Sequence, residues 1–491
     1  MHIVSRRGAC REKQNGVRMK GNWIMAGGIL TAAITTGAQA QHPGQLAGGD
    51  ITHAGVAPHE RSIGLGANPS TPSLSERRVR FGILSNISAG YEFGDADDFD
   101  RDVEQITDTF ELLESRFNAL DESSDDDEIQ SLLADAIDFE TNANALINDL
   151  SDSAYGKLSV SANGPGAPLS IRSEALKGVV TFDYGVNIDG RIAVESSGDA
   201  FASGLDALNP HEVTSDDIDD AGQTDDGYPF VEIDGEEYVF RPEKDAGLAV
   251  QGGIVQRFTA GYAREVSHNR DGSLHAGATV SGYRVTLARS GVLLDDSDDV
   301  EDRAEDEFED NQTTTTGFGI DVGVTWVADN FSLGATARNL NAPSFEYPDP
   351  CDSDEASQSC LFFEANPQAA RNGSSWTMER QLTLEGSVYT QNRRWILAAR
   401  LDANAVADTT GDDYQWAAVS ATYIPDSFWI PSPRAGIRTN LAGEELTYIS
   451  GGATFFRFLH LDVAGTLEET SVDNSTGPRS MQASLGMDLQ F

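Results

Sequence analysis

Apolar and polar residues alternate along much of the second half of the chain. Between residues 317 and 326, one set of alternate positions is apolar: Phe318, Ile320, Val322, Val324 and Trp326. The intervening set is small or polar: Gly317, Gly319, Asp321, Gly323 and Thr325. Similar runs begin at residues 331, 376 and 395, each after a short polar stretch. Because residues i and i+2 of a strand share a face, every run predicts a β-strand with one apolar face.

The first half predicts fewer strands and longer connections. The first convincing strand runs from Val79 to Phe93, and others cover 157–161 and 178–187. Asp189-Gly190 is a typical hairpin turn and predicts a return strand over 191–195. Long acidic loops follow at 197–228 and 291–316, with a small hairpin at Asp234-Gly235. We expect about 14 spanning strands, an even number as in single-chain barrels.

Residues 97–151 break the β pattern. Apolar residues recur there at helical spacing in two groups: Val103, Ile106, Phe110, Leu113, Phe117 and Leu120, then Ile129, Leu132, Leu133, Ile137, Leu146 and Ile147. Each group predicts an amphipathic helix, so the segment is a helical hairpin inserted after the first strand. A helix pair has no place in a lipid-facing barrel wall, and we expect it at one rim or inside the mouth. Packing of the two stripes on each other is favoured over a partner-binding role.

The last residues favour a membrane barrel over a soluble β-sandwich, which also has alternating strands. Every odd position from 481 is apolar, ending in Leu485, Met487, Leu489 and Phe491. Bacterial outer-membrane barrels end on such a strand, and these four residues are the expected barrel C-terminal signal. Past residue 40 no apolar run is long enough for a spanning helix, so a spanning chain must form a closed barrel. The predicted fold is an all-β, transmembrane, antiparallel outer-membrane barrel.

The N-terminal residues predict export. A basic stretch precedes an apolar run from Trp23 to Ile34, which ends at the small-residue site Ala38-Gln39-Ala40. This is the pattern of a cleaved signal peptide over residues 1–40. Residues 41–76, rich in Gly, Pro and Ser, then form a loosely ordered lead or a lumen plug, and residues 77–491 form the barrel. The expected location is the bacterial outer membrane.

The charge and the cysteines narrow the possible partners. The net charge of −45 becomes −50 without residues 1–40, which carry six Lys or Arg and one Glu. Such acidity argues against nucleic acid or an anionic phospholipid face as a partner. Cys351 and Cys360 flank a short polar stretch, and in an oxidising compartment they are expected to form a disulfide. A metal or redox pair is less favoured, because there is no C-x-x-C and no nearby histidine.

No catalytic chemistry is visible in the sequence. It has no H-E-x-x-H, G-x-S-x-G, P-loop or C-x-x-C, so we predict no enzyme, no cofactor and no metal site. Several charged residues occupy the inward face of the predicted strands: Asp321, Arg338, Glu379, Glu385, Arg400 and Asp402. They indicate a polar, side-chain-filled interior. Aromatic residues near segment ends suit interfacial girdles or a buried core: Tyr91, Phe93, Tyr262, Trp326, Trp376, Trp395, Tyr423, Phe428 and Trp429.

Three strand segments resemble a known family. Residues 331–340 (FSLGATARNL), 435–443 (AGIRTNLAG) and 455–462 (FFRFLHLD) are similar to those of exported proteins of the conjugal transfer protein TraF family. Asn68-Pro69 ahead of the first strand and the helical insertion follow the same order. The resemblance is to the barrel type of TraF and not to the thioredoxin-like type, whose cysteines are missing here. This family in turn looks like the FadL-type barrels that pass hydrophobic compounds.

The resemblance implies an envelope structural or interaction component of a conjugative DNA-transfer system. The alternative is a FadL-like outer-membrane channel for small hydrophobic compounds, which the polar interior disfavours. The expected partners are outer-membrane lipid, the outer-membrane barrel assembly machinery and other envelope or transfer proteins. Direct contact with nucleic acid is not expected from so acidic a chain.

Overall fold

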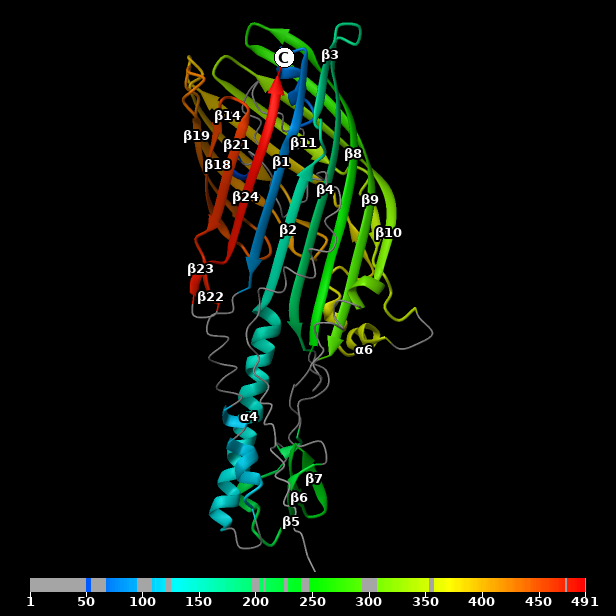
Figure 1. The fold of residues 1–491 in the computed structure, drawn as a ribbon, viewed down its shortest axis with the longest axis vertical. Coiled ribbons are helices and arrows are strands. Elements are labelled where there is room, and N and C mark those ends of the chain that lie inside the picture. Colours follow the sequence, from blue (N-terminus) through cyan, green and yellow to red (C-terminus); the bar gives the residue numbers. More distant parts are fainter. Residues whose placement is uncertain are drawn as a thin grey trace, which may run out of the picture.

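Strands that are consecutive along the sequence pair with each other around almost the whole sheet (Figure 1). The computed structural model describes residues 50–53, 68–94, 108–110, 112–120, 125–196, 203–205, 208–224, 228–239, 247–293, 307–352, 357–472 and 475–490. The barrel strands are β1 (Val79–Phe93), β2 (Tyr155–Asn163), β4 (Gly178–Glu195), β8 (Gly247–Asn269), β9 (Gly272–Leu293), β10 (Gln312–Val327), β11 (Phe331–Arg338), β14 (Gln381–Tyr389), β15 (Trp395–Asp402), β18 (Trp416–Tyr423), β19 (Ser432–Asn440), β20 (Thr447–Phe455), β21 (Leu459–Thr466) and β24 (Ser480–Gln490).

These strands form a closed, antiparallel 14-stranded barrel, which confirms the predicted fold class. Closure occurs at β1, which pairs with β24 on one side and with β2 on the other. In this register Ile87 lies opposite both Leu485 and Ala162. A short strand, β3 (Leu169–Ser173), adds pairs to β1 and β4. Among the described residues, no helix has the length and apolar character needed to cross a membrane.

The two faces of the barrel wall differ as the alternation predicts. On β15, exposed and buried residues alternate from Trp395 to Asp402 without interruption. The outward apolar side chains include Leu397, 55% exposed, and Leu485, 52% exposed. Apolar side chains this exposed are costly in water and favourable in lipid, so the outer face is the lipid-facing wall of a membrane barrel.

The two ends of the barrel are different. At the end where β1 begins and β24 ends, the strands are joined by short connections: 270–271, 328–330, 390–394, 424–431 and 456–458. We call this the turn end. The opposite, loop end carries the long connections, with β12 (Ser344–Glu346), α6 (Gln358–Ala365), η5 (Pro367–Ala369), β13 (Ser375–Thr377), β16 (Val406–Ala407), β17 (Asp413–Tyr414), β22 (Glu469–Val472) and β23 (Ser475–Pro478).

A small domain projects from the loop end (Figure 1). This distal domain consists of the described helical residues 112–117, α4 (Asp126–Ser153), η4 (Pro210–Glu212) and the sheet of β5 (Ile218–Gln223), β6 (Pro229–Ile233) and β7 (Glu236–Val239). Phe117 and Leu132 of the two predicted helical stripes share one buried core with Val231 of the sheet. The stripes therefore pack on each other and also on the connection between β4 and β8.

Two local predictions were wrong. Asp189-Gly190 is not a turn, because β4 continues through it and pairs with β2 and β8 along its length. The strand predicted from Trp376 is divided between β13, in the loop-end connection, and β14. Trp376 is 2% exposed and packs inside the barrel, so it belongs to no interfacial girdle. In both places, long-range strand pairing overrides the local pattern.

Candidate functional site

The inner face of β11, β14 and β15 carries a charged network. The register places Thr383 opposite Asp402, and Thr383 Oγ1 donates a hydrogen bond to Asp402 Oδ1 at 2.8 Å. Arg400 Nη2 lies 3.0 Å from each carboxylate oxygen of Asp402. Arg338 Nη1 donates to Thr383 Oγ1 at 3.1 Å. Because buried charges are costly unless they are paired, these contacts hold the inner face in one arrangement.

Most of the charged residues predicted to face inward do so. Asp321, Arg338, Arg400 and Asp402 take part in lumenal contacts, and Glu385 faces the described N-terminal residues. Glu379 lies in the connection ahead of β14 and is exposed, but it lines the same lumenal cavity as Arg338 and Arg400.

The described N-terminal residues lie inside the barrel. In α2 (Asp50–His53), Thr52 Oγ1 donates a hydrogen bond to Asp462 Oδ1 at 2.6 Å, and Ile51 O accepts one from Arg438 Nη1 at 2.9 Å. Asp462 also accepts from Arg434 Nε at 2.6 Å. Ile51 packs in a buried cluster with Trp416 and Tyr448. Residues 50–53 therefore occupy the lumen next to β19 and β21.

A second N-terminal stretch, residues 68–74 with η2 (Thr71–Leu74), crosses the lumen near β9 and β10. Asn68 Nδ2 donates to Glu385 Oε1 at 2.8 Å, and the hydroxyls of Ser70 and Thr325 lie 2.7 Å apart. Gly323 is required here, because a Cβ at this position would lie 2.0 Å from Asn68 Oδ1. A side chain at Gly277 would meet Pro69 O at 2.1 Å. These inward glycines make room for the chain that fills the barrel.

The connection between β15 and β18 is fixed to the wall by Lys157. The Lys157 ammonium is ion-paired with Asp408 and lies 3.0 Å from Asp412 Oδ2 and 2.7 Å from the Tyr414 hydroxyl. Burial raises the pKa of Asp412, but the positive charges of Lys157, Arg191 and Arg371 outweigh it and hold the pKa at about 2. Asp412 is therefore ionised at neutral pH, and this connection closes over the lumen near β2.

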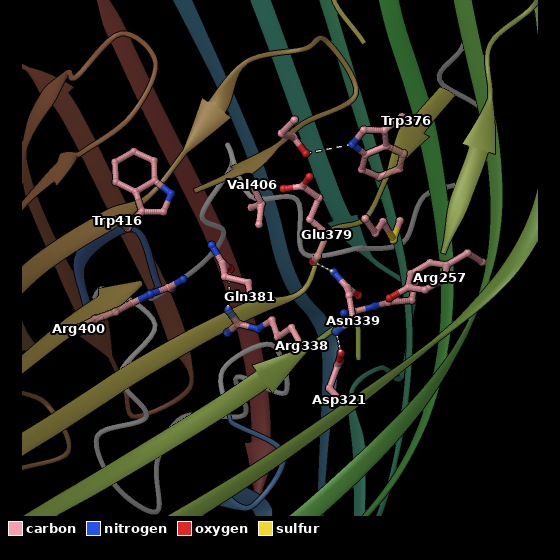
Figure 2. A pocket seen from close by; sticks show the side chains of 13 residues that line it. Arg257, Asp321, Arg338, Asn339, Trp376, Glu379, Gln381, Arg400, Val406 and Trp416 are labelled. Atoms are coloured by element: carbon pink, nitrogen blue, oxygen red, sulfur yellow. Dashed lines mark hydrogen bonds between the residues drawn. The ribbon is translucent and has the colours of Figure 1, made fainter. Parts of the chain in front are cut away.

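A cavity of about 60 Å³ remains between these groups (Figure 2). Its lining combines Arg257, Arg338 and Arg400 with Trp376 and Trp416. Trp376 is oriented by a hydrogen bond from its Nε1 to Ala407 O at 3.0 Å. Pockets for drug-sized ligands have roughly 300–1,000 Å³, so this cavity suits a few water molecules. A cavity of this size is too small for a large hydrophobic cargo.

Four of the charged residues singled out from the sequence line this cavity: Asp321, Arg338, Glu379 and Arg400. The predicted disulfide and the C-terminal strand residues lie elsewhere. Cys351 and Cys360 form a disulfide in the loop-end connection that leads into α6, where Phe362 packs closely against Gly291 of β9. Leu485, Met487 and Leu489 alternate with buried residues on β24. Phe491 lies outside the described residues.

Sequence reasoning did not identify several residues of the lumen. Asp462 and Arg434 occupy alternate positions of apolar strands, so their inward direction could have been read from the pattern. Arg257 likewise occupies an inward position in the alternating pattern of β8, and its Nη2 lies 3.2 Å from Asp183 Oδ2. No pattern in the sequence predicts the direction of Asp408, because it lies in a connection, where side chains do not alternate regularly between two faces.

Comparisons with known proteins identify one family and several similar solved structures. Residues 66–402 match the family described as "F plasmid transfer operon, TraF, protein". Similar solved structures include the Pseudomonas putida toluene transporter TodX (12% identity, 92% of this chain and 99% of that chain, TM-score 0.42). Others are a Pseudomonas aeruginosa FadL homologue (10%, 92% and 99%, TM-score 0.39) and the Ralstonia pickettii toluene transporter TbuX (12%, 92% and 96%, TM-score 0.38). No curated protein matches the chain.

Proposed function

The chain belongs to the family of the TraF protein of the F plasmid transfer operon, and from this premise we propose that it is a structural and interaction barrel of a DNA-transfer system. In this role the barrel anchors the distal domain at the membrane and does not act as an open channel. The observation that carries the proposal is the filled lumen. Two N-terminal stretches and paired charges occupy the interior of the barrel.

The filled lumen favours a scaffold for an energetic reason. A passage for cargo would require residues 50–53 and 68–74 to leave their contacts with Asp462, Arg438 and Glu385. Each of these contacts is a hydrogen bond to a charged group, which contributes about 1.5–3 kcal/mol. A scaffold benefits from such rigidity, because its task is to hold a partner-binding domain in place.

The distal domain is the part that would meet a partner. Outer-membrane barrels have short periplasmic turns and long extracellular loops, so we assign the turn end to the periplasm and the distal domain to the cell exterior. Its helix α4 contains acidic residues and no basic ones. Direct contact with DNA is disfavoured, because two polyanions repel each other.

A second candidate function is a channel for small hydrophobic compounds. It is favoured by the apolar part of the cavity lining, formed by Trp376, Met378 and Trp416. In this case the N-terminal stretches would be a removable plug. The two functions make opposite demands on the distal domain, since only the scaffold needs it folded.

Deletion of the gene, followed by complementation, separates the two functions. We expect the deletion strain to lose conjugation frequency and to keep normal uptake of long-chain hydrophobic compounds. Leu132→Asp, in the distal core, should fail to restore conjugation, whereas Leu112→Asp should restore it because Leu112 is 57% exposed. Lost uptake with normal conjugation would overturn the proposal in favour of the channel.

A further inference from the structure

Exposed aromatic side chains gather at one sector of the turn end. Trp429 is 77% exposed and Phe428 is 43% exposed in the connection between β18 and β19. The ring of Phe456, from the next hairpin turn, lies 5.9 Å from the ring of Trp429. Arg457 lies in the same turn as Phe456, and Arg393 and Arg394 lie in the connection between β14 and β15. We call the whole set the turn-end patch: Arg393, Arg394, Trp395, Tyr423, Phe428, Trp429, Phe456, Arg457 and Phe458.

The turn-end patch is a built surface and not a chance collection of loops. Asp426 links the three connections, because its carboxylate is ion-paired with Arg394 and its backbone oxygen accepts a hydrogen bond from Arg457 Nη2 at 2.6 Å. Ile424 N also donates to Arg394 O at 2.7 Å. The side chains of neighbouring turns are thereby held at fixed positions relative to each other.

The turn between β20 and β21 retains large side chains in an unfavourable backbone conformation. Phe456 and Arg457 have φ values of 51° and 63°, and Phe458 N donates to Phe455 O at 3.1 Å. Two central residues with positive φ define a turn that favours Asn and Gly. Bulky residues there cost stability, which points to a role for the side chains themselves.

The charge of the turn-end patch is opposite to that of the chain. The net charge of the protein is −45, yet connections 390–394, 424–431 and 456–458 contain three arginines and one acidic residue, Asp426. Since Asp426 pairs with Arg394, the charges of Arg393 and Arg457 are left without a carboxylate partner within these connections. The acidity of the whole chain disfavours binding to an anionic membrane surface, but the positive charge of the turn-end patch favours it.

We propose that the turn-end patch binds the headgroup of an anionic phospholipid in the membrane leaflet at the turn end. Trp395 pairs across the strands with Tyr423, and two residues further along is Leu397 of the lipid-facing wall. The patch is thus continuous with the apolar surface of the barrel. Aromatic rings favour the headgroup level, and basic side chains beside them bind phosphate. This continuity favours lipid over a protein partner.

Brominated lipids, which quench tryptophan fluorescence on contact, test the proposal with the full chain in nanodiscs. The signal of Trp429 is the difference between the native protein and Trp429→Phe, since the chain has six tryptophans. We expect brominated phosphatidylglycerol to quench this signal in preference to brominated phosphatidylcholine. One basic side chain near an anionic surface contributes roughly fivefold, so Arg393→Gln/Arg457→Gln should lower the preference by roughly 25-fold.

Two further variants separate lipid binding from structure. Arg264→Gln/Arg270→Gln also removes two positive charges, but at the turn end of β8 and β9, away from the patch. This variant should leave the preference for brominated phosphatidylglycerol unchanged. Phe456→Asn/Arg457→Gly supplies the residues that the turn favours, so it should keep the barrel folded while lowering the preference about fivefold. Equal quenching by both lipids in the native protein, or equal losses in the patch and control variants, would overturn the proposal. Absence of quenching of Trp429 by either lipid would place it outside the bilayer and would also overturn the proposal.

Discussion

Asp462 shows how one buried carboxylate joins three parts of the barrel. It is 1% exposed on β21 and accepts hydrogen bonds from Arg434 of β19 and from Thr52 of the N-terminal stretch, both at 2.6 Å. The ion pair between Asp462 and Arg434 stabilises the fold little relative to apolar packing of similar volume. Either residue without the other, however, would be a buried, unpaired charge. The effect of a substitution here therefore depends on whether the partner is also changed.

We expect Asp462→Ala to lower the free energy of unfolding by about 3–5 kcal/mol, because it leaves the Arg434 guanidinium buried without a carboxylate. Arg434→Leu/Asp462→Leu should be less harmful than Asp462→Ala alone. Urea unfolding in detergent, followed by tryptophan fluorescence, measures the free energy of unfolding of both variants. Arg394→Ala is the control, since it breaks an exposed ion pair with Asp426 that should be worth less than about 1 kcal/mol. Similar losses for Asp462→Ala and Arg394→Ala would contradict this account.

Asp412 makes the loop end sensitive to acid. Burial raises its pKa, but Lys157, Arg191 and Arg371 hold the folded-state pKa at about 2, below the usual value of about 3.9. A depressed pKa stabilises the folded state above the unfolded pKa, and this stabilisation is lost as the pH falls through the folded pKa. The difference in unfolding free energy between the native protein and Asp412→Asn should be constant above about pH 5 and shrink between about pH 4 and 2. Asp413→Asn, at an exposed neighbour, controls for loss of charge in this connection. A difference that does not change with pH would refute the expectation.

At the scale of elements, α4 shows how an amphipathic pattern is completed by distant strands. Its first turn carries Asp126, Asp127 and Glu128, which suit the positive end of a helix dipole. Its apolar stripe packs on the preceding helical residues and on β5–β7. The distal domain thus has its own core, separate from the lumen.

We predict that Leu132→Ala destabilises the distal domain and spares the barrel. Leu132 is 1% exposed in the distal core, and a Leu→Ala change at such a site costs about 2–5 kcal/mol. Limited proteolysis should cut α4 rapidly while the barrel strands stay protected. Leu112→Ala, at a position 57% exposed, is the matched control and should resist the protease like the native protein. Loss of barrel protection in Leu132→Ala would show that the two parts fold as one unit.

At the scale of the whole molecule, closure depends on the pairing of β1 with β24. Residues 80–92 of β1 pair with residues 480–490 of β24, whereas β2 and β3 pair with β1 on its other side. Unpaired backbone groups in lipid cost several kcal/mol each, so an open barrel is not stable there. Closure is therefore an all-or-none property of the sheet.

Deleting residues 480–491 should abolish heat-modifiable migration in detergent gels, because no strand remains to close the barrel. A deletion of equal length over 295–306, in the long connection between β9 and β10, should preserve it. Outer-membrane fractionation of both variants gives an independent measurement. A truncated protein that still migrates as a folded barrel would contradict the role of β24.

The sequence by itself determined the features that depend on a local period. Alternation within β10, β15 and β24 identified the lipid-facing wall, and helical spacing identified the insertion after β1. These signals are local because side-chain direction along a strand or helix follows from backbone geometry alone. Even the inward charges Asp321 and Arg400 could be assigned in this way.

Only the tertiary structure decided how the interior is filled and which local signals fail. The partners of Asp462 come from residues 28 and 410 positions away, and no sequence period links such residues. Asp189-Gly190 has the composition of a turn, but pairing of β4 with two neighbours over its length outweighs that preference. The hydrogen bonds along β4 act together over many residues and so outweigh the preference of two residues for a turn, and they form only when the strands of the barrel pair.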